Sequence, residues 1–147
     1  MSIRLKLEGF EEMLKAIEKA GSSADNAAEA CLKKSAVIME SELKAQMQAA
    51  DYKDAMSRLI SRMPSYSIER DHGRITARVG YKKGAYNPDN PSDGYKVVFL
   101  NYGTPHRKVH GQVVARGFIQ KAKSRAKPKM YKVQKQTLDE ILRGLKG

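Results

Sequence analysis

The sequence predicts an α+β fold, in which a long α-helix packs on a small antiparallel sheet and a further helix forms the C-terminal part. Residues 24–50 contain neither Gly nor Pro and repeat apolar residues at helical spacing. Residues 3–7 and 66–79 alternate apolar and polar side chains, as half-buried strands do. Helical spacing returns from Phe118 to Leu142. Together these patterns predict one layer of strands and one of helices.

The N-terminal part predicts an edge strand and a short helix. Ile3, Leu5 and Leu7 alternate with basic residues, so one face of this strand is expected to be buried. Apolar residues then follow helical spacing from Phe10 to Ile17, and Gly21 is a suitable stop.

The longest predicted helix begins after Ser22 or Ser23, either of which can cap it, and ends near Ala50. On its other face, Glu29 with Lys33 and Glu40 with Lys44 have the spacing of stabilising ion pairs. An apolar stripe predicts a helix laid across a sheet and makes Cys31 a core residue rather than a nucleophile; it contains Ala28, Cys31, Leu32, Ala36, Met39, Leu43 and Met47.

A weaker pattern from Asp51 to Pro64 indicates a short helical turn around Met56, Leu59 and Ile60. Two strands then face each other across Asp71, His72 and Gly73, which have the chemistry of a hairpin turn. The stretch from Gly84 to Gly94 is rich in Gly, Pro, Asn, Asp and Ser. We expect it to form an exposed loop that is flexible in the isolated protein and is ordered by a neighbouring subunit.

The apolar run from Tyr95 to Tyr102 is too short to separate helix from strand, and Gly103 ends it. Pro128 has the properties of a first-turn residue, so the C-terminal helical region is predicted to be kinked or restarted there.

Length and composition bound the class of protein. The 147 residues are 41% hydrophobic, which suits a single domain spanning 1–147. A lone cysteine excludes an internal disulfide, and no N-terminal apolar run indicates a signal peptide or membrane span, so we expect a cytosolic protein. The net charge of +12 favours an anionic partner or simply a basic surface.

The positive charge is concentrated in one segment. From Gly94 to Leu138 there are eleven Lys and Arg residues and no Asp or Glu, whereas the rest of the chain carries seventeen bases and sixteen acids. This asymmetry favours a partner-binding surface, although a solvated basic face is the alternative. The candidate binding residues are Arg107, Lys108, Arg116, Lys121, Lys123, Arg125, Lys127 and Lys129.

The chain offers few residues for catalysis. His106 and His110 have the spacing of a metal pair, but Pro105 and Gly111 disfavour a helix there, and no further ligand lies nearby in sequence. The sequence has no phosphate-binding glycine loop, nucleophile elbow or zinc-finger pattern. We therefore predict no enzyme activity, no cofactor and no metal site.

Four short motifs occur in a fixed order along the chain. They are GFEEMLKAIEKAG at Gly9 to Gly21, a Ser-Arg-Leu turn at Ser57 to Leu59, VVFLNYGT at Val97 to Thr104, and ARGFIQKA at Ala115 to Ala122. Their order resembles the neck and tail-completion family of long-tailed bacteriophages, which has a Gly-Phe-Glu opening, a Thr-Gly-Arg-Leu turn after the second helix, a Glu-Phe-Gly-Thr segment and an Ala-Arg-Pro-Phe-Leu helix start. The sequence departs from the family pattern at Met56 and Ser57, and also at Asn101, Tyr102 and Gly117, where the family has Glu, Phe and Pro.

The resemblance implies a structural protein of a phage or prophage virion that joins or completes the tail at the head-tail neck. It implies a ring, by analogy with tail-tube symmetry a hexamer, that contacts adjoining connector or tail-end proteins and transiently meets genomic DNA. Its expected location is the virion neck or tail, and the host cytoplasm during assembly, with no membrane contact. Gly103 and Thr104 are expected to form a structural turn, and Phe118 to anchor the following helix in the core.

Two other function classes stay open. A basic nucleic-acid-binding protein, such as a regulator or toxin, would use the segment from Gly94 to Leu138 against phosphates, but this segment lacks a recognition-helix scaffold and an aromatic stacking platform. A small hydrolase with a non-standard site is the weaker alternative. Within the neck interpretation, an acidic protein is favoured over DNA as the target of the cations, because a phosphate-binding lining would hold the moving genome.

Overall fold

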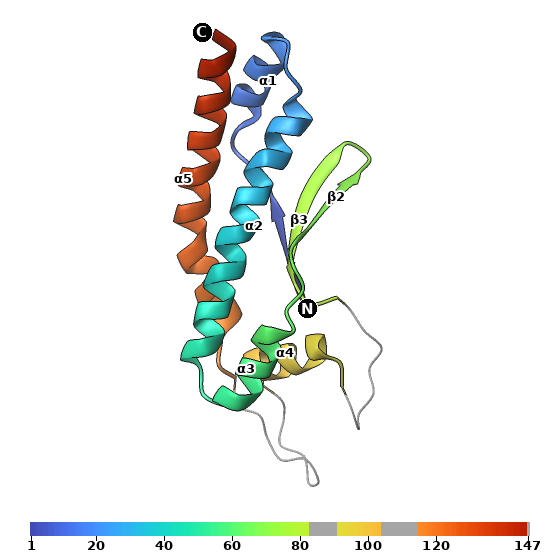
Figure 1. Cartoon of the computed structure of the whole chain (residues 1–147), viewed down its shortest axis with the longest axis vertical. Coiled ribbons are helices and arrows are strands. Elements are labelled where there is room, and N and C mark those ends of the chain that lie inside the picture. Colours follow the sequence, from blue (N-terminus) through green and yellow to red (C-terminus); the bar gives the residue numbers. More distant parts are fainter. Residues whose placement is uncertain (83–90, 104–114, 147) are drawn as a thin grey trace.

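A three-stranded antiparallel sheet lies on one side of the molecule (Figure 1). The computed structural model describes residues 1–82, 91–103 and 115–146. The strands are β1 (Ser2–Lys6), β2 (Ser67–Asp71) and β3 (Arg74–Gly80), in the order β1-β3-β2. The predicted first strand is therefore an edge strand, as expected, and the predicted hairpin is confirmed.

The register of the sheet separates an apolar face from a polar face. Ile3 pairs with Val79 and Leu5 pairs with Ala77, and all four side chains are buried. The hairpin turn has φ of 48° at His72 and 77° at Gly73. Positive φ at both central residues is the geometry of the two-residue turn that matches strand twist, so this turn fixes which face of β3 is buried.

One long helix lies between the sheet and the C-terminal helix. Helix α2 (Ala24–Ala49) crosses the apolar face of the sheet, and α5 (Phe118–Lys146) runs along the other side of α2 in the opposite direction (Figure 1). Ser23 caps α2, because its side chain accepts a hydrogen bond from the Asn26 amide at 3.2 Å. Every residue of the predicted apolar stripe is buried. The predicted α+β fold, with a long helix on an antiparallel sheet and a C-terminal helix, is thus confirmed.

The short helices lie at opposite ends of the α2/α5 pair (Figure 1). Helix α1 (Glu11–Lys19) packs near the C-terminal end of α5, where Phe10, Ile17, Cys31 and Leu138 form a small apolar cluster. Helices α3 (Lys53–Ser61) and α4 (Asp93–Tyr102) lie at the other end. The two long helices therefore extend from this apolar cluster at one end to helices α3 and α4 at the other.

Helices α3 and α4 correct two predictions. The helical turn predicted around Met56, Leu59 and Ile60 is confirmed, and it extends to a regular helix whose apolar face packs against the core. The predicted Ser-Arg-Leu turn at Ser57 to Leu59 therefore lies inside α3. The predicted loop ends earlier than Gly94, since Asp93 and Gly94 form the first turn of α4 and Gly94 is buried. A Cβ atom on Gly94 would lie 2.9 Å from the Met1 nitrogen, so only glycine fits there without displacement. Residues 84–90 of that loop lie outside the described residues.

Two further predictions hold only in part. Helix α5 does not restart at Pro128 but runs through it. The proline removes one hydrogen bond to the Ser124 carbonyl, and since both residues are exposed, water can satisfy that carbonyl. Glu29 pairs with Arg70 of β2 at 3.1 Å rather than with Lys33, whereas Glu40 and Lys44 do form the expected pair, at 3.8 Å.

Candidate partner-binding surface

Four of the predicted binding residues are exposed on α5. Lys121, Lys123, Arg125 and Lys127 are exposed, and none of them forms an ion pair with any described residue. The helix is held by its other face, where Ile119, Ala122 and Ala126 are buried. Arg107, Lys108 and Thr104, together with His106 and His110, lie outside the described residues.

A basic stripe runs along α5 and extends further than the sequence analysis indicated. Lys121, Arg125, Lys132 and Lys135 are all exposed, and at 3.6 residues per turn they fall within roughly 80° of the helix circumference. Lys132 and Lys135 belong to the predicted basic segment but are not among the predicted binding residues. Their helical spacing was the available signal, and the expected break at Pro128 concealed it. We call these four residues the α5 basic stripe.

Two predicted binding residues are used inside the fold. The Arg116 side chain is only 10% exposed, forms an ion pair with Asp51, and places its guanidinium 4.0 Å from the centre of the Tyr52 ring. Lys129 forms an ion pair with Glu42 of α2. These contacts fix the start of α5 against the α2–α3 connection and the middle of α5 against α2, so both cations have a structural role besides any binding role.

Asn101 joins the end of α4 to the start of α5. Its backbone carbonyl accepts hydrogen bonds from the Arg116 and Gly117 amides at 3.1 and 3.0 Å, and its Oδ1 accepts one from the Ile119 amide at 2.8 Å. Asn101 is 1% exposed, and its Nδ2 has no hydrogen-bond partner among the described residues. Because the first amides of a helix have no partner within the helix, Asn101 serves as a cap supplied from a distant part of the chain.

Gly103 lies in a left-handed backbone conformation that suits the turn predicted there. Its φ is 79°, and its amide donates to the Phe99 carbonyl at 2.8 Å, which closes the end of α4. Phe118 is 1% exposed and belongs to the main core, as predicted. Gly103 therefore ends α4 and Phe118 begins α5, the two helices that Asn101 joins.

A buried polar network links α2 to α5 near Cys31. Gln134 Nε2 donates to Ser35 Oγ at 2.8 Å, and Ser35 Oγ donates to the Cys31 carbonyl at 2.9 Å. Cys31 is fully buried, which raises the pKa of its thiol to about 11. A neutral, buried thiol is a poor nucleophile, so the geometry agrees with the predicted core role of Cys31.

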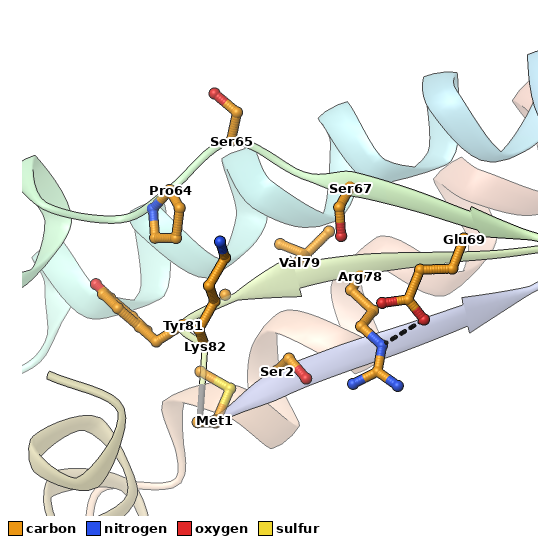
Figure 2. Close-up of a pocket in the computed structure, with 11 residues that line it drawn as sticks. Met1, Ser2, Pro64, Ser65, Ser67, Glu69, Arg78, Val79, Tyr81 and Lys82 are labelled. Atoms are coloured by element: carbon orange, nitrogen blue, oxygen red, sulfur yellow. Dashed lines mark hydrogen bonds and ion pairs between the residues drawn. The ribbon is translucent and has the colours of Figure 1, made fainter. Parts of the chain in front are cut away.

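A pocket of about 520 Å³ lies beside the exposed face of the sheet and the segment that follows α3 (Figure 2). Glu69 lines it and forms an ion pair with Arg78 at 3.0 Å, drawn as a dashed line in Figure 2. Ser65 and Ser67 also line it, but its described lining contains no histidine or cysteine that would activate a serine or bind a metal. In the described part of the chain, no group of three or more His, Cys, Asp or Glu residues is arranged to hold a metal ion.

Comparisons with known proteins found no match for this chain among family models, curated proteins or solved structures. Across the described residues, no helix is both long enough and apolar enough to span a membrane.

Proposed function

We propose that this protein is a structural component of a phage or prophage virion, which joins or completes the tail at the head-tail neck as part of a ring. The observation that carries the proposal is the shared order of four motifs with the neck and tail-completion family, from the Gly-Phe-Glu opening at Gly9 to the helix start at Ala115 to Ala122. The proposed role is non-catalytic and needs no cofactor.

The geometry at Asn101 supports the proposal. Two of the four motifs, VVFLNYGT and ARGFIQKA, meet in space, and Asn101 of the first caps the helix that begins in the second. The resembling family has Glu at this position, and a Glu would also offer an oxygen to the amides that begin α5. Asn101 supplies this acceptor without burying a charge, so this departure from the family pattern preserves the contact.

The α5 basic stripe suits an acidic surface on an adjoining connector or tail-end protein. Opposite charge would steer docking and fix the register of the two proteins, with an effect that weakens as salt rises. A dense set of phosphate contacts would instead retard the genome as it passes through the ring, because each neutralised phosphate strengthens binding. The proposal therefore assigns the stripe to protein contact and leaves DNA contact transient.

The test of the proposed function is electron microscopy of particles made with and without the gene. A neck protein predicts separated heads and tails, or tails with defective ends, when the gene is deleted, and complete particles when it is restored in trans. Complete, infectious particles from the deletion strain would overturn the proposal. A closed ring, expected to contain six copies, predicts a discrete oligomer in native mass spectrometry of the protein or of its complex with a neck partner.

A basic nucleic-acid-binding protein is the second candidate, favoured by the four cations of the stripe, which have no ion-pair partner among the described residues. Binding of the wild type to duplex DNA and to purified connector or tail-end protein, at low and at physiological salt, separates the two. Tight DNA binding at physiological salt without any binding to the protein partners would favour the nucleic-acid candidate.

A further inference from the structure

A groove separates α3 from α4 at the end of the molecule where these two helices lie. Its volume is about 320 Å³, at the lower end of the usual range for ligand pockets, about 300 to 1,000 Å³. Each helix contributes one face. The lining residues follow helical spacing on both sides; they are Ala55, Arg58 and Leu59 from α3, Arg62 directly after it, and Lys96, Phe99 and Leu100 from α4.

The groove has an apolar floor and a cationic rim. Leu59 is buried, while Ala55, Phe99 and Leu100 are half-buried and so offer apolar surface to the groove. The rim is formed by three basic side chains, Arg58, Arg62 and Lys96. Such a combination binds a segment that presents both apolar and negatively charged side chains.

One of the three rim cations is neutralised within the fold. Arg62 pairs with Asp93 through two contacts, from Nε to Oδ2 at 3.0 Å and from Nη2 to Oδ1 at 3.1 Å. The pair connects the end of α3 to the first turn of α4. Arg58 and Lys96 have no ion-pair partner among the described residues. The Arg62 pair therefore leaves two rim cations, Arg58 and Lys96, to meet a ligand.

We propose that this groove binds an acidic peptide segment of a partner protein, with an apolar side chain of the segment on Leu59, Phe99 and Leu100 and its carboxylates on Arg58 and Lys96. Charge complementarity selects this occupant, since a basic or neutral segment would leave both cations unpaired. The apolar floor argues against a nucleic-acid backbone, which would bury no apolar surface there. The proposal goes beyond the neck function, because it names a separate site on α3 and α4.

Three short fluorescein-labelled peptides test this site by fluorescence anisotropy. The first places Leu at helical spacing among Glu residues, the second replaces every Glu by Lys, and the third replaces every Leu by Ser. The first peptide is expected to bind the wild-type protein and the second not to bind. The third is expected to bind more weakly than the first by about tenfold or more. A fluorescein-labelled DNA duplex measures nucleic-acid binding in the same assay.

Two double variants with equal changes of charge localise the binding. Arg58→Glu with Lys96→Glu is expected to weaken binding of the acidic peptide by about tenfold or more. Lys33→Glu with Lys34→Glu changes two exposed cations of α2 outside both the groove and the α5 basic stripe, and it is expected to keep binding within about twofold. Thermal unfolding of both variants checks that they fold. Methyl NMR of the wild type gives a second readout that needs no variant, because the peptide should shift the signals of Leu59 and Leu100.

Three outcomes would overturn the proposal. They are a wild-type protein that does not bind the acidic peptide, peptide-induced shifts that avoid Leu59 and Leu100, and a groove variant that loses DNA binding while peptide binding is unchanged. None of them bears on whether particles assemble without the gene, so the groove and the neck function can fail separately.

Discussion

Replacing Asn101 tests how the α4 and α5 segments are joined. Asn101→Ala removes the oxygen that accepts the Ile119 amide and leaves the backbone bonds to Arg116 and Gly117 in place. Ile119 is 3% exposed, so its amide gains no water in compensation. A buried amide without a partner costs about 1 to 3 kcal/mol. The substitution also removes Nδ2, a buried donor with no partner among the described residues. Removing this unsatisfied donor is favourable and offsets part of the cost.

We therefore expect Asn101→Ala to lower the free energy of unfolding by about 1 to 2 kcal/mol. Asn101→Leu is the matched variant, since it fills a similar volume and removes the same acceptor, so it should be destabilising by a similar amount. Equilibrium unfolding in urea measures both variants, with an unchanged dependence on denaturant if the native fold is retained. A stable Asn101→Leu beside an unstable Asn101→Ala would refute the reasoning, because packing alone would then explain the effect.

Three other substitutions have defined outcomes. Phe118→Ala should lower the free energy of unfolding by about 3 to 5 kcal/mol in the same assay, because this fully buried ring anchors α5, and a cost below about 1 kcal/mol would contradict that role. Burial raises the pKa of the Cys31 thiol from 9.0 to about 11, so the unfolded chain loses this proton first. Between pH 8 and 10 the wild type should therefore lose about 1 kcal/mol more stability than Cys31→Ala, and equal losses would refute this. Reversal of Lys121, Lys123 and Arg125 to Glu should leave thermal unfolding nearly unchanged but reduce incorporation into particles, and normal incorporation would count against the α5 face as a binding surface.

Local signals were strong enough to predict the central elements. The Ser23 cap and the apolar stripe of α2 act within one helix, and the positive φ values at His72 and Gly73 follow from the turn chemistry of the hairpin. The apolar run before Gly103 did not separate helix from strand, because a short buried segment carries no clear period. The helix also makes contacts with other parts of the chain that no local pattern reveals, such as the Arg62 and Asp93 pair.

Contacts between distant residues explain the remaining differences. Glu29 meets Arg70 because α2 lies over the sheet, which no local spacing reveals. Pro128 is tolerated inside α5 because it lies on the exposed side of the helix, a fact that depends on how α5 packs against α2. Tertiary packing therefore determines both the ion-pair partner of Glu29 and the tolerance of Pro128 inside α5.

The candidate surface was predicted in part. Lys121, Lys123, Arg125 and Lys127 are exposed on α5, as a binding surface requires. Arg116 was not distinguishable from them by charge, yet its ion pair with Asp51 and its contact with the Tyr52 ring give it a structural role. The sequence shows where positive charge lies along the chain. Only the fold separates the cations that face solvent from those that hold helices together.

Immunogold electron microscopy of purified particles tests the central proposal most directly. An antibody raised against this protein is applied to particles from the producing strain, with particles from the deletion strain as the control. The account predicts gold label at the junction of head and tail in the wild type and none in the control. Intact particles that carry no label, with the protein recovered only in the fraction bound to free DNA, would contradict it.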